Sequence, residues 1–135
     1  MSRSGYSDDC DGWALIRWRG AVKSAIRGKR GQSFMREMLA ALDALPEKRL
    51  ERDILVDGNN CCAMGAVALA RGTDVSQIDP DNATQVAGWM EISFALAKEI
   101  AFENDEGGHW KETPEQRFSR VRQWVVGQIK SEGVS

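Results

Sequence analysis

The most informative stretch for the fold of this 135-residue chain is Cys62-Ala63-Met64-Gly65-Ala66-Val67-Ala68-Leu69-Ala70. Every residue in it is apolar or small, and a helix that is apolar on all sides is normally buried. Gly65 has no side chain, so a neighbouring element can approach closely, and Gly72 stands where a glycine commonly ends a helix. The stretch predicts a mainly α fold, a single compact domain of five or six helices around a buried small-residue helix at about residues 62–71.

The segment before this helix has a different pattern. Ile54-Leu55-Val56 is rich in β-branched residues, Asp57-Gly58 is typical of a tight turn, and a second short segment runs from Asn59 to Cys62. The pattern favours a small β-hairpin at about residues 53–62, and an irregular loop is the alternative.

Apolar residues recur at helical spacing on both sides of these segments, which predicts the surrounding helices. The first two helices would meet at a turn marked by Gly28 and Gly31, and Pro46 would end the second. Further on, Ser93 would cap one helix, and Thr113-Pro114-Glu115-Gln116 has both parts of a capping box with proline at the first helical position. The expected helices cover about residues 11–27, 32–45, 79–89, 94–104 and 114–131.

Length and composition describe one domain, residues 1–135, with residues 1–8 and 132–135 expected to fray. No apolar run is long enough to span a membrane, and residues 1–11 lack the apolar segment of a secretory signal, so we expect no membrane partner. The chain has three cysteines, which form neither a disulfide framework nor a Cys-x-x-Cys pair. Such cysteine usage is typical of a reducing, cytoplasmic setting.

The net charge of −2 conceals two opposed blocks of charge. Residues 12–36 contain seven basic side chains and no acidic one, whereas residues 74–106 contain eight acidic side chains and one lysine. This asymmetry indicates a charged partner, and the alternative is that the two blocks face each other within the fold. Two sets of candidate partner-binding residues follow: a basic stripe of Arg19, Lys23, Arg27 and Arg30 at helical spacing, and an acidic face of Glu99, Glu103, Asp105 and Glu106.

The basic stripe could also lie along a phosphate backbone, with Trp13 or Trp18 stacking on bases. The overall negative charge of the chain weighs against this use. Nucleic-acid binding through the helix at residues 17–30 is therefore the alternative to protein binding. Three tryptophans near predicted element ends could anchor a protein partner; they are Trp13, Trp89 and Trp110.

Catalysis by a cysteine is the second alternative. Cys61 or Cys62 would stand at a helix N-terminus, where the helix dipole lowers the pKa of a thiol, and His109 could act as a general base oriented by Asp105 or Glu106. However, these cysteines open a helix expected in the core, and nothing in the sequence places His109 near them. A single histidine and an adjacent cysteine pair also lack the spacing of a zinc site. We therefore expect no enzyme, no metal and no cofactor.

Segments spread over nearly the whole chain resemble a family of small phage and prophage proteins. They are SRSGYSDD (2–9), WALIRWR (13–19), GKRGQ (28–32), LPEKRL (45–50), CAMGA (62–66), NDE (104–106) and ETPE (112–115). The resemblance implies a bacteriophage or prophage origin, and because the family has no assigned activity it identifies no catalytic residue. It also implies one cysteine at the position of Cys62, with Cys61 additional, and no fixed histidine at His109.

The resemblance and the charge pattern together predict a non-enzymatic phage accessory protein that acts in the cytoplasm of an infected or lysogenic bacterium. We expect it to bind a host protein, as an inhibitor of antiviral defence such as CRISPR. The acidic face would occupy the nucleic-acid groove of a defence complex, or the basic stripe would engage an acidic patch. The acidic face is the first choice and the basic stripe the second, and a homodimer is compatible with both.

Overall fold

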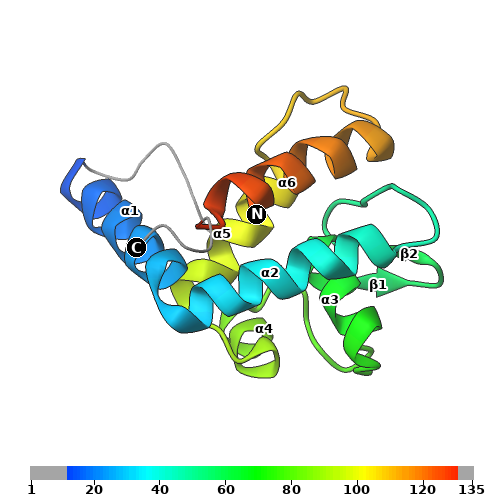
Figure 1. The fold of residues 1–135 in the computed structure, drawn as a ribbon, viewed down its shortest axis with the longest axis horizontal. Helices are drawn as coiled ribbons and strands as arrows, with labels where there is room; N and C mark the ends of the chain where they lie inside the picture. The colour runs from blue at the N-terminus through cyan, green and yellow to red at the C-terminus, as the bar shows by residue number, and fades with distance from the viewer. Residues whose placement is uncertain (1–11, 131–135) are drawn as a thin grey trace.

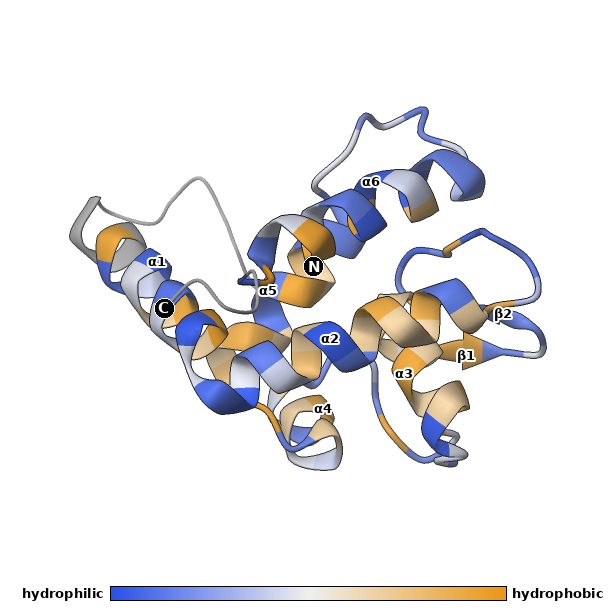
Figure 2. Cartoon of the chain, in the orientation of Figure 1, coloured by the Kyte–Doolittle hydropathy of each residue, from blue (hydrophilic) through white to orange (hydrophobic). Residues whose placement is uncertain are grey.

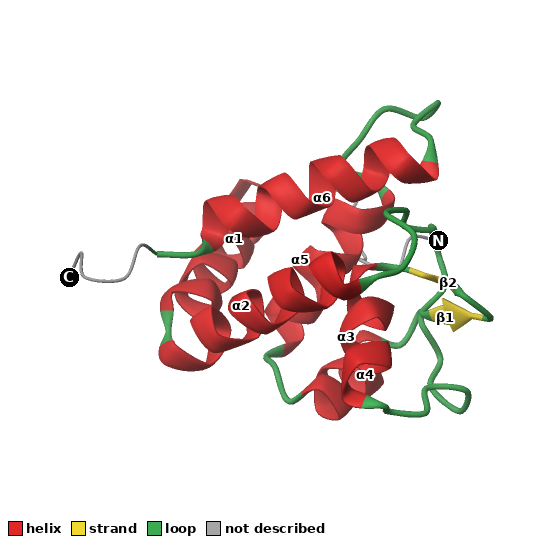
Figure 3. Ribbon diagram, turned by 45° about the vertical axis from the view of Figure 1, so that its right-hand side comes forward, coloured by secondary structure: helices red, strands yellow, loops and turns green. Residues whose placement is uncertain are grey.

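The structure, a computed structural model, describes residues 12–130, with side chains from Ile16 onward. Its elements in chain order are α1 (Gly12–Arg27), α2 (Lys29–Ala44), β1 (Val56–Asp57), β2 (Asn60–Cys61), α3 (Ala63–Arg71), α4 (Ala83–Met90), α5 (Phe94–Asp105) and α6 (Pro114–Gln128) (Figure 1). The two strands pair antiparallel, with Val56 opposite Cys61. The predicted mainly α fold with one small hairpin is confirmed (Figure 3).

Helix α3 is buried from Ala63 to Ala68, and only its last turn reaches the surface. Gly65 lies so close to the backbone carbonyl of Leu55 that a Cβ atom at this position would overlap it. Gly72, with a φ of 71°, ends the helix in the left-handed conformation that favours glycine. The buried small-residue helix predicted from the sequence is therefore present, and the missing side chain of Gly65 lets the segment before β1 pack against it.

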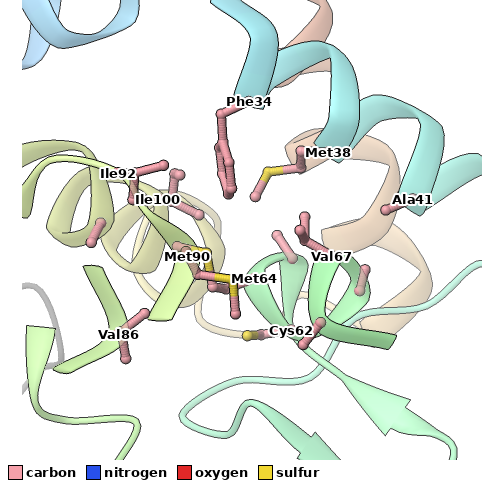
Figure 4. Packing of buried hydrophobic residues seen from close by; sticks show 14 of the residues in the cluster. Phe34, Met38, Ala41, Cys62, Met64, Val67, Val86, Met90, Ile92 and Ile100 are labelled. Carbon is pink, nitrogen blue, oxygen red and sulfur yellow. The ribbon is translucent and has the colours of Figure 1, made fainter. Parts of the chain in front are cut away.

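Helix α2 connects the parts of the core, since it packs against α1, α3 and α6. Hydrophobic residues are concentrated where α2 and α3 face each other (Figure 2). Figure 4 shows Phe34 and Met38 of α2 pointing toward Val67 of α3 and Met90 at the end of α4, and all four are buried. Burial of these side chains holds the helices together, because each buried side chain of this size contributes about 1.5–3 kcal/mol.

The turn between the first two helices is tighter than predicted. Helix α2 begins at Lys29 rather than at Gln32, with only Gly28 between it and α1. Gly31 packs against the backbone carbonyls of Ala25 and Ile26, so a side chain at this position would overlap α1. The absence of that side chain allows α2 to start immediately, and as a result Arg30 belongs to α2 instead of α1.

Two further boundaries differ from the prediction because side chains bind the backbone at the helix ends. Helix α4 begins only at Ala83, because the Asn82 side chain accepts a hydrogen bond from the Gln85 amide and so caps the helix there. Helix α6 ends at Gln128, whose carbonyl accepts a hydrogen bond from the Gln32 side chain of α2. The caps predicted at Ser93 and at Thr113 are confirmed, the latter as a complete capping box.

None of the helices within residues 12–130 combines the length and apolar character needed to cross a membrane. The expectation that residues 1–8 and 132–135 fray concerns parts of the chain outside the described residues.

Candidate binding surface

Helix α1 buries one side and exposes the other. Val22 and Ile26 are buried where α1 packs on α2 and α5, and Trp18 and Ala25 are half-buried beside them. The opposite side carries an exposed line of residues at helical spacing, which includes an isoleucine that is 63% exposed. We call this surface the α1 face; it comprises Ile16, Arg19, Gly20, Lys23 and Arg27.

The three cations of the α1 face make no ion pair with any other described residue. The ion pairs of the described chain all involve other arginines, at positions 49, 71, 117, 120 and 122. Since each residue of an α-helix rises about 1.5 Å, Lys23 lies about 6 Å along the axis from both Arg19 and Arg27. A Cβ atom built on Gly20 would meet nothing within 4 Å, so no packing among the described residues requires glycine here.

Arg30, the fourth residue of the predicted basic stripe, is not on the α1 face. It lies on α2, where its Nε donates a hydrogen bond to the carbonyl of Glu91 (2.8 Å). There it lines a groove of about 640 Å³ that also contains Arg71. Arg71 is paired with both carboxylate oxygens of Glu37 (2.6 Å each). The prediction of one four-residue stripe on a single helix is therefore wrong, because the tight turn at Gly28 separates Arg30 from the others.

The predicted acidic face is divided between the interior and the surface. Asp105 is only 7% exposed, and its carboxylate accepts hydrogen bonds from the Asp53 amide (3.2 Å) and the Asn104 side chain (2.9 Å). The side chain of Asn104 also accepts from the amide of Ala63 (3.0 Å), the first residue of α3. Asp105 therefore stabilises the packing of α5 on the segments around α3, and reversing its charge would disturb the fold.

The remaining acidic residues differ in exposure. Glu106 is exposed and Glu99 half-buried, whereas Glu103 is half-buried with Oε2 3.8 Å from Nη1 of Arg120. Burial, and then the neighbouring carboxylate of Glu99, raise the pKa of Glu103 above its ordinary value. The long contact with Arg120 is too weak to offset the burial. Glu99 and Glu106 are thus the residues of the predicted acidic face best placed to meet a partner.

A buried ion-paired cluster beside this face was not predicted from the sequence. Glu112 contacts two arginines of α6, Arg117 at 3.4 Å and Arg120 at 2.7 Å, and its side chain is 9% exposed. Arg117 is 6% exposed and donates to the carbonyl of Leu50 (2.9 Å), which ties the segment before the hairpin to α6. The spacing of three residues between the two arginines on one helix is the sequence signal for this cluster. The charges of this cluster therefore stabilise the packing of the neighbouring segments on α6.

The alternative in which the two charge blocks face each other is not supported by ion pairs. Among the residues that the structure describes, no ion pair joins residues 12–36 to residues 74–106. The two blocks are linked by the hydrogen bond from Arg30 to the carbonyl of Glu91 (2.8 Å) and by Lys98, the only cation of the acidic block. Its ammonium lies 4.8 Å from the ring centroid of Trp18 and 4.9 Å from that of Phe94, and so connects α1 with α5.

The residues of the cysteine alternative are not brought together. Cys61 and Cys62 are each 1% exposed, and burial, followed by the neighbouring Cys62, raises the pKa of Cys61 to about 12. The sulfur of Cys62 accepts a hydrogen bond from the Gly65 amide (3.4 Å) and so caps α3. His109 lies on an exposed loop, where it stacks on Trp110. Both cysteines therefore belong to the core.

Two of the three tryptophans expected near element ends are exposed. Trp89 on α4 is 49% exposed and Trp110 in the loop before α6 is 77% exposed, while the side chain of Trp13 lies outside those described.

Within the described chain, no group of three or more histidine, cysteine, aspartate or glutamate side chains could hold a metal ion. No family model, no curated protein and no solved structure matches the chain. The α1 face is the candidate site on its geometry: exposed cations, an exposed isoleucine and an uncovered glycine on one side of one helix.

Proposed function

We propose that this protein is a non-enzymatic binding protein whose α1 face docks on an acidic surface of a partner protein. The observation that carries the proposal is the exposed line of Arg19, Lys23 and Arg27 without an ion pair in the described chain. Like charges four residues apart destabilise a helix by about 0.2–0.5 kcal/mol per pair. An acidic partner surface would turn this repulsion into attraction and would also steer the approach of the two proteins.

The α1 face favours a protein partner over a phosphate backbone. Ile16 lies on the same line as the three cations and is 63% exposed, so it offers apolar area that a partner protein can bury. A phosphate backbone gains nothing from an isoleucine, since it is bound by charge and hydrogen bonds. Gly20 adds to the argument because an uncovered glycine lets a partner approach the helix backbone closely.

The setting of this binding rests on the resemblance to phage and prophage proteins. In such a setting the partner belongs to the bacterial host, and we propose a component of antiviral defence such as a CRISPR complex. The same resemblance supports action in the host cytoplasm. Nucleic-acid binding by α1 is the second candidate, because the same three cations could contact phosphates.

The experiment is a pull-down of tagged protein from a lysate of the bacterium that carries the gene, with and without nuclease. The test variant is Lys23→Glu with Arg27→Glu. The matched control is Lys29→Glu with Arg36→Glu, which changes the net charge equally at two exposed cations of α2; Arg36 makes a long hydrogen bond (3.3 Å) to the carbonyl of Lys130, an exposed contact whose loss costs little. We expect a discrete protein partner that persists after nuclease, is retained by the control and is reduced at least tenfold with the test variant.

Three outcomes contradict the proposal in different ways. A partner set that disappears after nuclease treatment indicates nucleic acid instead of protein. Equal retention of the partner by the test variant excludes the α1 face as the binding site. Loss of the partner in Glu99→Lys with Glu106→Lys, but not in the α1 variant, transfers the binding site to the exposed part of the predicted acidic face.

A further inference from the structure

The loop between α5 and α6, residues 106–113, is held in one shape by a single arginine of α6. The guanidinium of Arg120 donates to the backbone carbonyls of Glu103 (2.5 Å) and Asn104 (3.3 Å) near the end of α5. It also binds both carboxylate oxygens of Glu112, with Nε 2.7 Å from Oε2 and Nη2 3.0 Å from Oε1. Arg120 therefore fixes the chain on both sides of the loop tip.

Two glycines let the loop pass directly over this guanidinium. A Cβ atom on Gly107 would lie 2.7 Å from Nη1 of Arg120, and one on Gly108 would lie 2.6 Å from Nε, both shorter than real Cβ contacts. The amide of Glu112 donates to the carbonyl of His109 (2.9 Å) and closes the tip. The path of the loop is thus determined by packing on Arg120.

The tip of the loop presents Trp110, which is 77% exposed and the most exposed large hydrophobic side chain of the described chain. His109 stacks on it, with ring centroids 5.8 Å apart and an angle of 27° between the rings. The ammonium of Lys111 lies 4.8 Å from the centroid of the same ring, and the Lys111 amide donates to Nδ1 of His109 (3.1 Å). These contacts with its two neighbours restrict the indole before any partner arrives, which lowers the entropic cost of binding.

We infer that residues 106–113, the Trp110 loop, form a second docking surface, which inserts the indole of Trp110 into an apolar pocket of a partner protein with a carboxylate at its rim. The carboxylate would face the ammonium of Lys111. Tryptophan is among the residues that contribute most to protein interfaces, and a protruding side chain fits a concave partner. Figure 1 places the loop beside the N-terminal end of α6 and α1 at the opposite end of the molecule. The two surfaces can therefore be occupied at the same time.

The charges near the indole favour a protein over other macromolecules. Lys111 is the only lysine or arginine from residue 106 to residue 116, and the exposed residues Glu106 and Glu115 stand within five positions of Trp110. A phosphate backbone or an anionic lipid surface presents a row of negative charges, of which Lys111 can pair with one while Glu106 and Glu115 repel the others. A single carboxylate at the rim of a protein pocket needs only the one ammonium of Lys111. Interfacial membrane binding also needs more apolar area than one side chain in the loop provides.

The experiment places the photo-cross-linking residue p-benzoylphenylalanine at position 110 of the full chain, in lysate of the bacterium that carries the gene. The matched control has the same residue at position 89, where an exposed tryptophan is also replaced. Purified unlabelled protein is added as a competitor in wild-type form, as Trp110→Ala and as Lys111→Glu. We expect one discrete protein adduct at position 110 and none of that size at position 89. Wild-type protein should compete at least tenfold better than either variant.

Several results overturn the inference. Equal competition by wild-type protein and Trp110→Ala shows that the indole does not contribute. The benzophenone at position 110 is itself a large aromatic side chain that can enter an apolar pocket, so absence of a specific adduct shows that no such pocket receives this loop. An adduct of twice the chain mass indicates a second copy of this chain, and an adduct sensitive to nuclease indicates nucleic acid. Because Trp110 is exposed, Trp110→Ala is expected to leave the fold intact, and circular dichroism of the competitor is the check.

Discussion

The α1 face and the ion-paired cluster of Glu112, Arg117 and Arg120 are both rich in charge, yet the charges have different surroundings. In the cluster, the Glu112 side chain is 9% exposed and contacts both arginines, and Arg117 is 6% exposed. On the α1 face, Lys23 is exposed and has no carboxylate partner among the described residues. A buried charge depends on its partner for its stability, whereas an exposed one is stabilised by water.

This difference separates residues that hold the fold together from residues available to a partner. Removing one member of the cluster leaves buried charges uncompensated, so its loss is expected to appear as a change in the free energy of unfolding. Removing a cation of the α1 face leaves no buried charge uncompensated, so its loss is expected to change the affinity for the partner rather than the free energy of unfolding. Measurements of unfolding and of binding on the same variants therefore test the comparison directly.

The largest effect is expected for Glu112→Ala. The substitution removes the shared partner of Arg117 and Arg120, and breaking a buried ion pair costs about 3 kcal/mol or more. Urea unfolding should show a loss of about 3 kcal/mol in the free energy of unfolding. The control Glu115→Ala, at an exposed position in the first turn of α6, should lose less than about 0.5 kcal/mol. A loss of under about 1 kcal/mol for Glu112→Ala would show that water already compensates the cluster.

Acid pH is expected to reproduce part of this loss. The hydrogen bond from Arg120, and to a smaller extent its charge, lower the pKa of Glu112 in the folded protein below the ordinary value of 4.5. The stabilisation is therefore complete above pH 4.5 and is lost as the pH falls through the lowered pKa. Glu112→Gln should be less stable than the wild type at pH 7 and should lose less stability between pH 5 and pH 3. If the free energy of unfolding falls equally with pH in the two proteins, protonation of Glu112 is not the cause of the acid destabilisation.

The pKa of Glu103, in the same region, is shifted in the opposite direction to that of Glu112, so its charge has the opposite effect on stability. Burial raises its pKa, so its charged form destabilises the fold above that raised pKa and its protonated form does not. Glu103→Gln should therefore be more stable than the wild type at pH 7, with the difference vanishing as the pH falls below 4.5. A variant less stable than the wild type at pH 7 would show that the contact with Arg120 outweighs burial.

Much of the fold was predictable from the sequence because its signals are local. The small-residue run before Gly72, the Asp57-Gly58 turn and the capping box at Thr113 each specify their own structure within a few residues. The tight turn at Gly28 was misplaced because it depends on contact between Gly31 and the carbonyl of Ala25, which is tertiary packing. Packing of this kind has no signature in hydrophobic periodicity.

The candidate site was only half predictable for the same reason. Periodicity placed Arg19, Lys23 and Arg27 on one side of a helix, and the structure confirms this. The sequence does not predict which of the charges remain exposed. Asp105, for example, is buried by hydrogen bonds to its carboxylate from Asn104 and from the amide of Asp53, which is distant in the sequence. A cluster of charges in a sequence indicates either a binding surface or a folding contact, and only the neighbours in space distinguish them.

A gain of about 1 kcal/mol is expected for Gly20→Ala. Glycine inside a helix costs about 0.5–1 kcal/mol relative to alanine, and a Cβ atom at Gly20 would meet nothing within 4 Å. Gly31→Ala, also in a helix, should instead lose stability, because its Cβ atom would overlap the carbonyl of Ala25. Thermal unfolding of Gly20→Ala and Gly31→Ala compares their stabilities. Gly20→Phe then tests binding by the α1 face, because it adds a large side chain there without changing the charge. A partner that binds Gly20→Phe as well as the wild type would not contact this helix closely.

The smallest effect, a gain of about 0.5 kcal/mol, is expected for Lys23→Gln at low salt. The substitution removes two like-charge pairs, with Arg19 and with Arg27, each four residues away. The gain should disappear in 1 M salt, where the screening length is only about 3 Å. Arg36→Gln, which has no cation four residues away on α2, should show no salt-dependent gain. If Lys23→Gln is more stable and binds the partner more weakly, the same charge opposes folding and supports binding, which is the distinction between the α1 face and the buried cluster. A salt-independent change in stability would instead place Lys23 in a contact within the fold.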